Sequence, residues 1–363
     1  MRIGILTLPL HTNYGGILQA YALQTVLERM GHEAVVIDTP NVKPTPSLFT
    51  LGKRIFKRLL GYHVGVFPER KHNQIYPVIS QHTQLFVDKY IHRKVVHSPE
   101  ELQESEFDAV VVGSDQVWRP KYYGKIENAY LNFTKSWKIK RIAYAASFGT
   151  DDWEYTPKQT IECGNLLKMF DAVSVRESSA VELCKEHFGV DAVHVLDPTM
   201  LLDKEDYIRL IEAANTPKSK GMLLNYILDE TPEKRALIEQ IAKDKCLVSF
   251  RVNSKVEDYN ASLEERIQPP VEEWLRGFYD AEFVVTDSFH ACVFSILFGK
   301  PFVVVGNKER GMARFESLLK MFGLEDRLVS SIEDYYHVGK IKYNESRLQE
   351  KREQSRKFLS IHL

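Results

Sequence analysis

Cysteine is scarce in this sequence, and its scarcity excludes a chain held together by disulfides or zinc. The 363 residues include only 4 cysteines, which lie far from one another: Cys163, Cys184, Cys246 and Cys292. None forms a C-x-x-C pair or lies at metal spacing from a histidine, which is typical of buried thiols in a reducing compartment. We therefore expect no disulfide framework. Because no cluster of carboxylates and histidines has metal spacing either, we also expect no essential metal ion.

An excess of positive charge is also missing, as is a long uninterrupted apolar run. Lysine and arginine total 48 against 49 acidic residues, a formal net charge of -1, which disfavours a nucleic-acid partner. The most apolar stretch, residues 283–305, contains Asp287, His290 and Lys300 and has the pattern of strand, helix and strand, not of a membrane span. The N-terminus enters a strand without the pattern of a signal peptide, so the sequence predicts a cytoplasmic protein.

The sequence does contain a repeated alternation of short apolar strands with amphipathic helices. Strands are expected at 3–6, 34–37, 109–112, 141–145, 172–175 and 192–196, and in a second series at 222–226, 246–250, 283–285 and 302–305. Helices are expected at 15–30, 231–242, 271–279 and 289–298. Such alternation produces parallel sheets covered by helices. The predicted fold class is therefore α/β, with two Rossmann-like doubly wound domains that face a cleft.

The change from the first series to the second divides the chain. An N-terminal α/β domain is expected at 1–197, with an insert at about 41–105, and a C-terminal α/β domain at 198–334. The polar helical tail, 335–363, is a candidate to pack back on the first domain. Two such domains bind a ligand at the carboxyl ends of their strands, so polar residues that follow strands are the candidates for chemistry.

The first candidate follows the first strand: Asn13, Tyr14, Gly15 and Gly16. Free backbone N–H groups at a helix start suit a phosphate, a carboxylate or a sugar oxygen. The alternative is a plain Asn N-cap with glycines that allow close packing. The segment lacks the G-x-G-x-x-G pattern, which argues against a dinucleotide cofactor.

The second candidate follows another strand: Ser114, Asp115, Gln116 and Trp118. Hydrogen-bonding groups next to an aromatic ring suit the hydroxyls and apolar face of a sugar. The alternative is a capped turn without a ligand.

Arginines at two strand ends are candidate anion ligands. Arg176 precedes a helix N-terminus and could clamp an anion, although a surface pair with Glu177 is the alternative. Arg310 and Arg314 are four residues apart, so on a helix they would share one face and could grip a phosphate or carboxylate. The alternative there is a solvated basic face.

The sharpest signal is Asp287, Ser288 and His290, where a strand ends and a helix begins. The helix N-terminus supplies donors, and His290 can exchange a proton near neutral pH. A core histidine on an apolar helix is the alternative.

A basic amphipathic helix is expected within residues 53–58. Its cations are Lys53, Arg54, Lys57 and Arg58, with apolar residues between them. Such a helix can lie on anionic lipid or receive a phosphate-bearing substrate. A plain amphipathic surface helix is the alternative.

The order of several blocks resembles the polysaccharide pyruvyl transferase family. The blocks are Ile3-Gly4-Ile5-Leu6 with Asn13-Tyr14-Gly15-Gly16, Gly113-Ser114-Asp115-Gln116-Val117-Trp118, Ser174-Val175-Arg176-Glu177, Asp197-Pro198-Thr199 and Thr286-Asp287-Ser288-Phe289-His290. The resemblance extends over about residues 1–330 and implies a fold like that of GT-B glycosyltransferases. It also implies transfer of pyruvate from phosphoenolpyruvate to two hydroxyls of a surface-polysaccharide sugar, as a ketal, without a cofactor.

The resemblance also implies roles for single residues. Arg176 matches an arginine that holds the donor, and His290 matches the donor-site histidine and is the candidate acid and base. Asp115 or Asp287 would orient the histidine or an acceptor hydroxyl. Some members have arginine where this chain has Ser288, so we expect Arg310 or Arg314 to replace that charge.

Two other functions remain open at this stage. One is a GT-B glycosyltransferase with a nucleotide-sugar donor, and the other is a non-catalytic glycan-binding relative. The acceptor sugar can be free or linked to a lipid phosphate. In the second case residues 53–58 would bring the protein to the inner face of the membrane as a peripheral protein.

Overall fold

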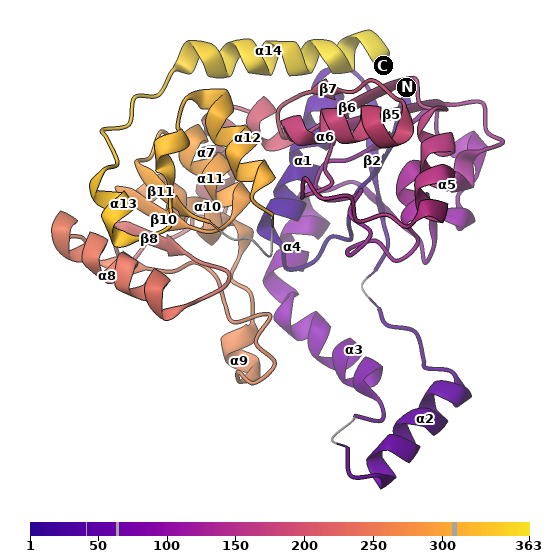
Figure 1. The fold of residues 1–363 in the computed structure, drawn as a ribbon, viewed down its shortest axis with the longest axis horizontal. Coiled ribbons are helices and arrows are strands. Elements are labelled where there is room, and N and C mark those ends of the chain that lie inside the picture. Colours follow the sequence, from indigo (N-terminus) through magenta and orange to yellow (C-terminus); the bar gives the residue numbers. More distant parts are fainter. Residues whose placement is uncertain (41, 63–64, 307–310) are drawn as a thin grey trace.

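Two parallel sheets, each covered by helices, form the body of the molecule (Figure 1). The computed structural model describes residues 1–40, 42–62, 65–306 and 311–363. The first sheet has 7 strands in the order β3-β2-β1-β4-β5-β6-β7, and the second has 5 in the order β12-β11-β10-β8-β9. The strand pairs in both sheets are parallel, which confirms the predicted α/β class.

The first sheet is built from runs of apolar residues. Its strands are β1 (Arg2–Leu6), β2 (Glu33–Asp38), β3 (Arg93–Val95), β4 (Ala109–Val112), β5 (Lys140–Ala146), β6 (Ala172–Val175) and β7 (Val193–His194). All four residues of central β4 are buried, because helices cover both faces of a parallel sheet. Strand β3 was not predicted: it is a short edge strand of mostly polar residues, which carries no apolar pattern.

The sequence pattern did not indicate three of the helices around the first sheet, which lie at Pro68–Ile79, Gln81–Tyr90 and Pro157–Leu167. The helices of this part of the chain are α1 (Tyr14–Arg29), α2 (Leu48–Leu59), α3 (Pro68–Ile79), α4 (Gln81–Tyr90), α5 (Pro157–Leu167) and α6 (Ser178–Leu183). The expected insert divides into two parts. Helix α4 and strand β3 join the layers of the first sheet, whereas α2 and α3 project away from the body (Figure 1).

The second sheet contains the four strands and three helices of the predicted second series, together with elements that the pattern did not indicate, such as the strand Leu328–Val329 and the helix Lys204–Ala213. The strands are β8 (Leu223–Tyr226), β9 (Ser249–Phe250), β10 (Phe283–Thr286), β11 (Phe302–Val305) and β12 (Leu328–Val329). The helices are α7 (Lys204–Ala213), α8 (Pro232–Lys245), α9 (Leu263–Arg266), α10 (Val271–Asp280), α11 (Phe289–Leu297), α12 (Ala313–Phe322), α13 (Ile332–Tyr336) and α14 (Glu345–His362). Short helical turns complete the chain at Pro99–Glu101, Glu104–Glu106, Ile126–Tyr130, Asn132–Thr134, Cys184–Phe188, Pro198–Leu201 and Glu325–Arg327.

The first turn of α1 joins the two domains. The ring of Tyr14 stacks on Trp274 of α10 with 5.5 Å between ring centroids. Its hydroxyl donates to the carbonyl of Pro269 at 2.8 Å. Because Tyr14 is fully buried, this contact fixes the start of α1 against the second domain.

The C-terminal helix α14 packs on the first domain and the inter-domain connection. The guanidinium of Arg352 donates to the carbonyls of Met200 at 2.7 Å and Leu202 at 2.9 Å. Phe358 lies against Tyr144 of β5, with 6.3 Å between ring centroids. Among the described residues, no helix is both long and apolar enough to cross a lipid bilayer.

Candidate active site

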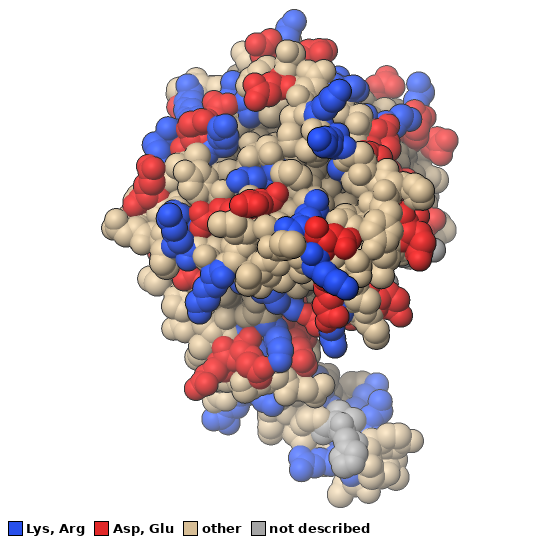
Figure 2. Space-filling model, turned by 90° about the vertical axis from the view of Figure 1, so that its left-hand side faces the viewer, with Lys and Arg blue, Asp and Glu red and all other residues tan. Residues whose placement is uncertain are grey.

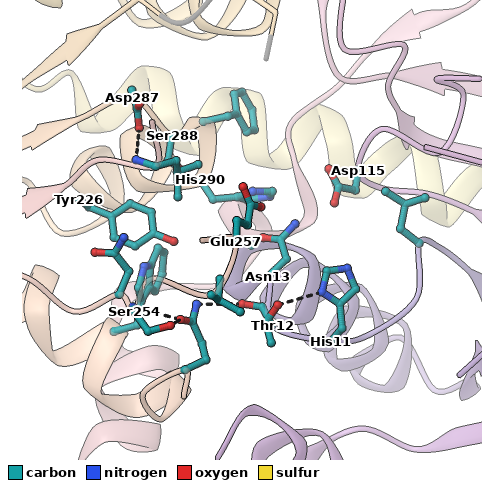
Figure 3. A pocket seen from close by; sticks show the side chains of 18 of the residues that line it. His11, Thr12, Asn13, Asp115, Tyr226, Ser254, Glu257, Asp287, Ser288 and His290 are labelled. Carbon is teal, nitrogen blue, oxygen red and sulfur yellow. Dashed lines mark hydrogen bonds between the residues drawn. The ribbon is translucent and has the colours of Figure 1, made fainter. Parts of the chain in front are cut away.

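A pocket of about 620 Å³ lies between the two domains. The first domain contributes Leu8, Pro9, His11, Thr12, Asn13, Gly15, Asp115, Gln116 and Tyr122. The second contributes Tyr226, Leu228, Glu230, Arg251, Asn253, Ser254, Lys255, Val256, Glu257, Asp258, Gln268, Trp274, Asp287, Ser288, Phe289, His290 and Arg314. Figure 3 shows Asn13 and Asp115 on loops of the first domain, and Tyr226 and His290 on elements of the second. The pocket thus lies at strand ends, as expected.

The predicted site residues separate into three groups. Those that line the pocket are Asn13, Gly15, Asp115, Gln116, Asp287, Ser288, His290 and Arg314. Those that lie behind or beside its wall are Tyr14, Gly16, Ser114, Trp118 and Arg176. Arg310 lies outside the described residues.

His290 is held at the start of α11 by close packing against α1. Ser288 occupies the N-cap position, so His290 is the second helical residue. A Cβ atom on Gly15 would lie only 2.0 Å from the Nδ1 atom of His290. Glycine is therefore needed in the first turn of α1, because any side chain there would displace the imidazole.

Asp197 is the carboxylate next to His290, and the predicted residues did not include it. Its Oδ2 atom lies 3.4 Å from the Nε2 atom of His290 and accepts a hydrogen bond from Arg176 at 2.9 Å. Its Oδ1 atom accepts from the hydroxyl and the N–H of Thr199 at 2.7 and 3.0 Å. Burial favours the neutral acid, but His290, Arg176 and the Thr199 hydroxyl outweigh it and hold the pKa of Asp197 below its usual range. An acidic residue soon after β7 was the signal that could have identified it.

Arg176 is a buried residue that two carboxylates neutralise. Besides Asp197, it reaches Asp115 at 3.4 Å, and its guanidinium lies 4.5 Å from the ring centroid of Phe289. Burial lowers the pKa of Arg176, but the two carboxylates outweigh it and raise that pKa. The alternative of a surface pair with Glu177 is wrong, because Arg176 is only 4% exposed.

Arg314 lines the pocket, as the cations Arg251 and Lys255 also do. It is the second residue of α12, and its guanidinium lies 5.5 Å from the centroid of the same Phe289 ring. Burial, and then repulsion from Arg176, lower the pKa of Arg314 to about 10. Arg314 is still charged at neutral pH, so it can bind an anion in a partly desolvated setting.

Asp115 turns sharply away from β4 and reaches the pocket. Its φ of 69° is in the left-handed region, where aspartate is better tolerated than most residues. Its Oδ1 atom accepts from the N–H of Gln116 at 2.9 Å. Burial favours the neutral acid, but Arg176, His290 and Arg314 outweigh it and lower the pKa of Asp115.

Trp118 and Ser114, predicted as acceptor ligands, are fully buried instead. The ring of Trp118 stacks on Tyr130 at 5.0 Å, and its Nε1 donates to the carbonyl of Ala129. The Ser114 hydroxyl donates to the carbonyl of Ala145. These positions leave no ring face or hydroxyl for a sugar. The adjacent Gln116 does line the pocket.

Asp287 stabilises the wall of the pocket that the second domain contributes. Its carboxylate accepts from the N–H groups of Leu228 and Asp229 at 2.7 and 3.1 Å and from the ammonium of Lys234 at 2.7 Å. These bonds fix the loop that follows β8. The carboxylate that the structure places 3.4 Å from the Nε2 atom of His290 is that of Asp197.

His11 is a pocket residue that the sequence reasoning missed. It lies in the loop between β1 and α1, and burial lowers its pKa despite the attraction of Asp115. Its imidazole is therefore neutral at pH 7 and able to accept a proton. The rule used for Asn13, that polar residues after a strand are candidates, applies equally to His11. Among the residues that the structure describes, no group of three His, Cys, Asp or Glu could hold a metal ion.

Two parallel α/β domains around a polar, charged pocket define a GT-B-like class of protein. The sequence model of the family named polysaccharide pyruvyl transferase matches residues 13–309. The match covers most of the chain, so the chain belongs to the polysaccharide pyruvyl transferase family. No curated protein matches the sequence.

Solved structures show the same fold at low sequence identity. UDP-GlcNAc 2-epimerase from Neisseria meningitidis, bound to UDP-GlcNAc, has a TM-score of 0.51 and 11% identity over 99% of this chain and 94% of that chain. Anabaena HepE in complex with UDP has a TM-score of 0.50 and 12% identity over 100% of this chain and 97% of that chain. At such identity the likeness shows the fold alone, and it agrees with the expected pair of Rossmann-like domains.

Proposed function

We propose that this protein is an enzyme that transfers pyruvate from phosphoenolpyruvate to two hydroxyls of a sugar. The product is a pyruvate ketal on a surface polysaccharide or its precursor, and the second product is phosphate. Membership of the family supports the reaction class. The observation that carries the proposal is that His290, whose imidazole lies 3.4 Å from Asp197, and the cation Arg314 both line the pocket.

The reaction requires one proton donor, two proton acceptors and cations for the donor. The methylene carbon of phosphoenolpyruvate gains a proton and becomes a methyl group, which makes the neighbouring carbon electrophilic. One sugar hydroxyl adds there and loses its proton, phosphate leaves, and the second hydroxyl adds and loses its proton. Positioned acids and bases accelerate such steps by about 100- to 10000-fold each.

In this scheme the imidazole of His290 is the general acid that protonates the methylene carbon of phosphoenolpyruvate, and it can also act as a general base. Asp197 orients its ring, and Arg176 holds Asp197 in place. Arg314 binds the carboxylate or phosphate of the donor, while Arg310 lies outside the described residues. Asp115 and the neutral His11 are the groups that can accept the hydroxyl protons.

The acceptor is proposed to lie against the first domain, where Asn13, Gly15 and Gln116 line the pocket. Asn13 is the N-cap residue of α1, but its side chain makes no capping bond. Its amide is therefore available to a sugar hydroxyl or another polar group. We further propose that the acceptor is a sugar linked to a lipid phosphate, presented at the cytoplasmic face of a membrane.

A nucleotide-sugar glycosyltransferase is the second candidate, because the similar folds described above were solved with UDP or UDP-GlcNAc. Thermal stability in the presence of phosphoenolpyruvate and of UDP-sugars distinguishes the two. A ligand at 100 times its dissociation constant stabilises a protein by about 2.7 kcal/mol, which raises the melting temperature by several degrees.

The matched variants for this test are Arg314→Ala and Arg347→Ala. Arg314 lines the pocket, whereas Arg347 is exposed on α14. We expect phosphoenolpyruvate to stabilise the wild type and Arg347→Ala, but not Arg314→Ala. Stabilisation by a UDP-sugar alone would favour the glycosyltransferase. Stabilisation by neither ligand, with sugar binding retained, would favour a non-catalytic glycan-binding relative.

A further inference from the structure

Helices α2 and α3 form an arm that extends from the first domain into solvent (Figure 1). No residue of α2 is buried. A helix in water gains most of its stability from packing an apolar face against something. The exposed apolar side chains of α2 therefore indicate that a partner covers them when the protein acts.

The surface of α2 divides into an apolar half and a basic half. With 100° between successive residues, the apolar half holds Leu48, Leu51, Ile55, Phe56 and Leu59. Leu48 is 87% exposed, Phe56 62% and Leu59 80%. The opposite half holds Lys53, Arg54, Lys57 and Arg58, and the helix contains no acidic residue. In Figure 2 the far end of the arm, at the bottom of the view, shows tan and blue side chains.

One of the four cations has a structural role. Arg54 donates to both carboxylate oxygens of Glu69 at 2.8 and 2.7 Å, which ties α2 to the start of α3. The ammonium of Lys53 lies 4.2 Å from the ring centroid of Phe49. Lys57 and Arg58 have no acidic neighbour on their own helix, so their charge is available to an external anion.

We propose that the arm binds an anionic lipid surface. The apolar half of α2 would enter the boundary between headgroups and acyl chains, which accepts such a face to a depth of about 5–10 Å. The cations beside it would contact the anionic headgroups. Interfacial helices combine an apolar face and a basic face in this way, and α2 has both.

A second copy of this chain fits the same face less well. A two-fold dimer through α2 would place the same surface of each copy against the other. The basic flanks of two helices would then meet without an acidic residue between them, and like charges at close range repel. An anionic bilayer instead satisfies the apolar half and the basic half together.

The root of the arm connects with the pocket wall. The N–H of Gln268 donates to the carbonyl of Ile79, the last residue of α3, at 2.9 Å. Gln268 lines the pocket, and its side-chain amide donates to the carbonyl of Thr12 at 3.0 Å. An arm seated on a bilayer would therefore tie the pocket wall to that bilayer, where a lipid-linked acceptor would be presented. The lipid-binding surface does not depend on whether phosphoenolpyruvate is the donor.

Co-sedimentation of the full chain with lipid vesicles tests the proposal. The vesicles are phosphatidylcholine, with and without phosphatidylglycerol. The first variant is K53E/K57E/R58E, which spares the structural Arg54. The second is I55D/L59D, which spares the basic half. The matched control is K135E/K138E/K168E, which reverses three exposed lysines elsewhere on the first domain.

We expect the wild type and the control to bind vesicles that contain phosphatidylglycerol. Each lost cation should weaken binding about five-fold, so the first variant should bind on the order of 100-fold more weakly. The second variant should lose binding as well. All variants should keep the wild-type melting temperature, because α2 has no buried residue.

Two results would overturn the proposal. The first is a failed co-sedimentation test, in which either the wild type does not sediment with anionic vesicles or the arm variants sediment as well as the wild type does. The other is a dimer, measured by sedimentation velocity, that I55D/L59D dissociates while no form of the protein binds vesicles. Neither result affects the thermal-shift test of the pocket, so failure of this inference and failure of the proposed function are distinguishable.

Discussion

Replacing Gly15 by alanine tests the contact that forms the candidate site between the two domains. The added Cβ atom would lie 2.0 Å from Nδ1 and 2.3 Å from Cγ of His290, well inside van der Waals contact. Either the imidazole or the first turn of α1 must move. The turn is also held by Tyr14, whose hydroxyl bonds to the second domain, so the strain falls on His290 and its partner Asp197.

The neighbouring Gly16 provides the matched control. A Cβ atom there would lie 3.4 Å from the side chain of Asn13 and 3.5 Å from that of Asp115, which are ordinary contacts. Both glycines are in the same helical turn, so the change in helix propensity is similar for the two variants. Only the contact with His290 differs.

We expect Gly15→Ala to lower stability by about 1–3 kcal/mol, the usual cost of overpacking a well-packed site. That cost corresponds to a fall of several degrees in melting temperature, measured by calorimetry or dye binding. Phosphoenolpyruvate-dependent release of phosphate should fall about 100-fold, because a misplacement near 1 Å costs that much. Gly16→Ala should stay within a few-fold of the wild type in both assays. Equal melting temperatures for Gly15→Ala and the wild type would refute the close approach of α1 to His290.

Three further predictions concern the buried charges. Arg176→Met should lower the stability by about 3–5 kcal/mol, because it leaves Asp197 and Asp115 without their shared cation. The loss would be measured as a lower denaturation midpoint, and the control Arg347→Met should show no such change. His290→Gln should lower phosphate release by about 100- to 10000-fold while leaving the melting temperature nearly unchanged, and full activity would remove His290 from the mechanism. The folded-state pKa of Asp197 is below its unfolded value near 4, so its contribution to stability is present above about pH 4 and is lost as the pH falls further. Asp197→Asn should therefore flatten the acid limb of a melting temperature versus pH curve, and an unchanged limb would contradict the ion pair.

The sequence predicted most of both sheets because buried parallel strands leave a simple pattern. Strands β1, β4 and β11 are runs of apolar residues with helical periodicity between them. The edge strand β3 was missed, because polar side chains are tolerated where a strand has one neighbour. In the arm, the basic amphipathic segment 53–58 predicted α2, whereas α3 lay in the part of the insert for which no helix was expected.

The rule that ligands bind where parallel strands end located the pocket but not its lining. It found Asp115 and Ser288, which do line the pocket. It also selected Trp118, whose ring is buried against Tyr130. A strand end shows where a side chain starts, whereas the packing of its neighbours decides where that side chain points.

The sequence by itself determined the fold class, the family and the strand ends at which chemistry is expected. These follow from local patterns, since apolar runs, glycines and caps act on nearby residues. Only the tertiary structure decided which groups meet. Asp197 and His290 belong to different segments and touch only because the two domains pack together at the first turn of α1. Such long-range contacts depend on the packing of the whole core, which no short stretch of sequence encodes.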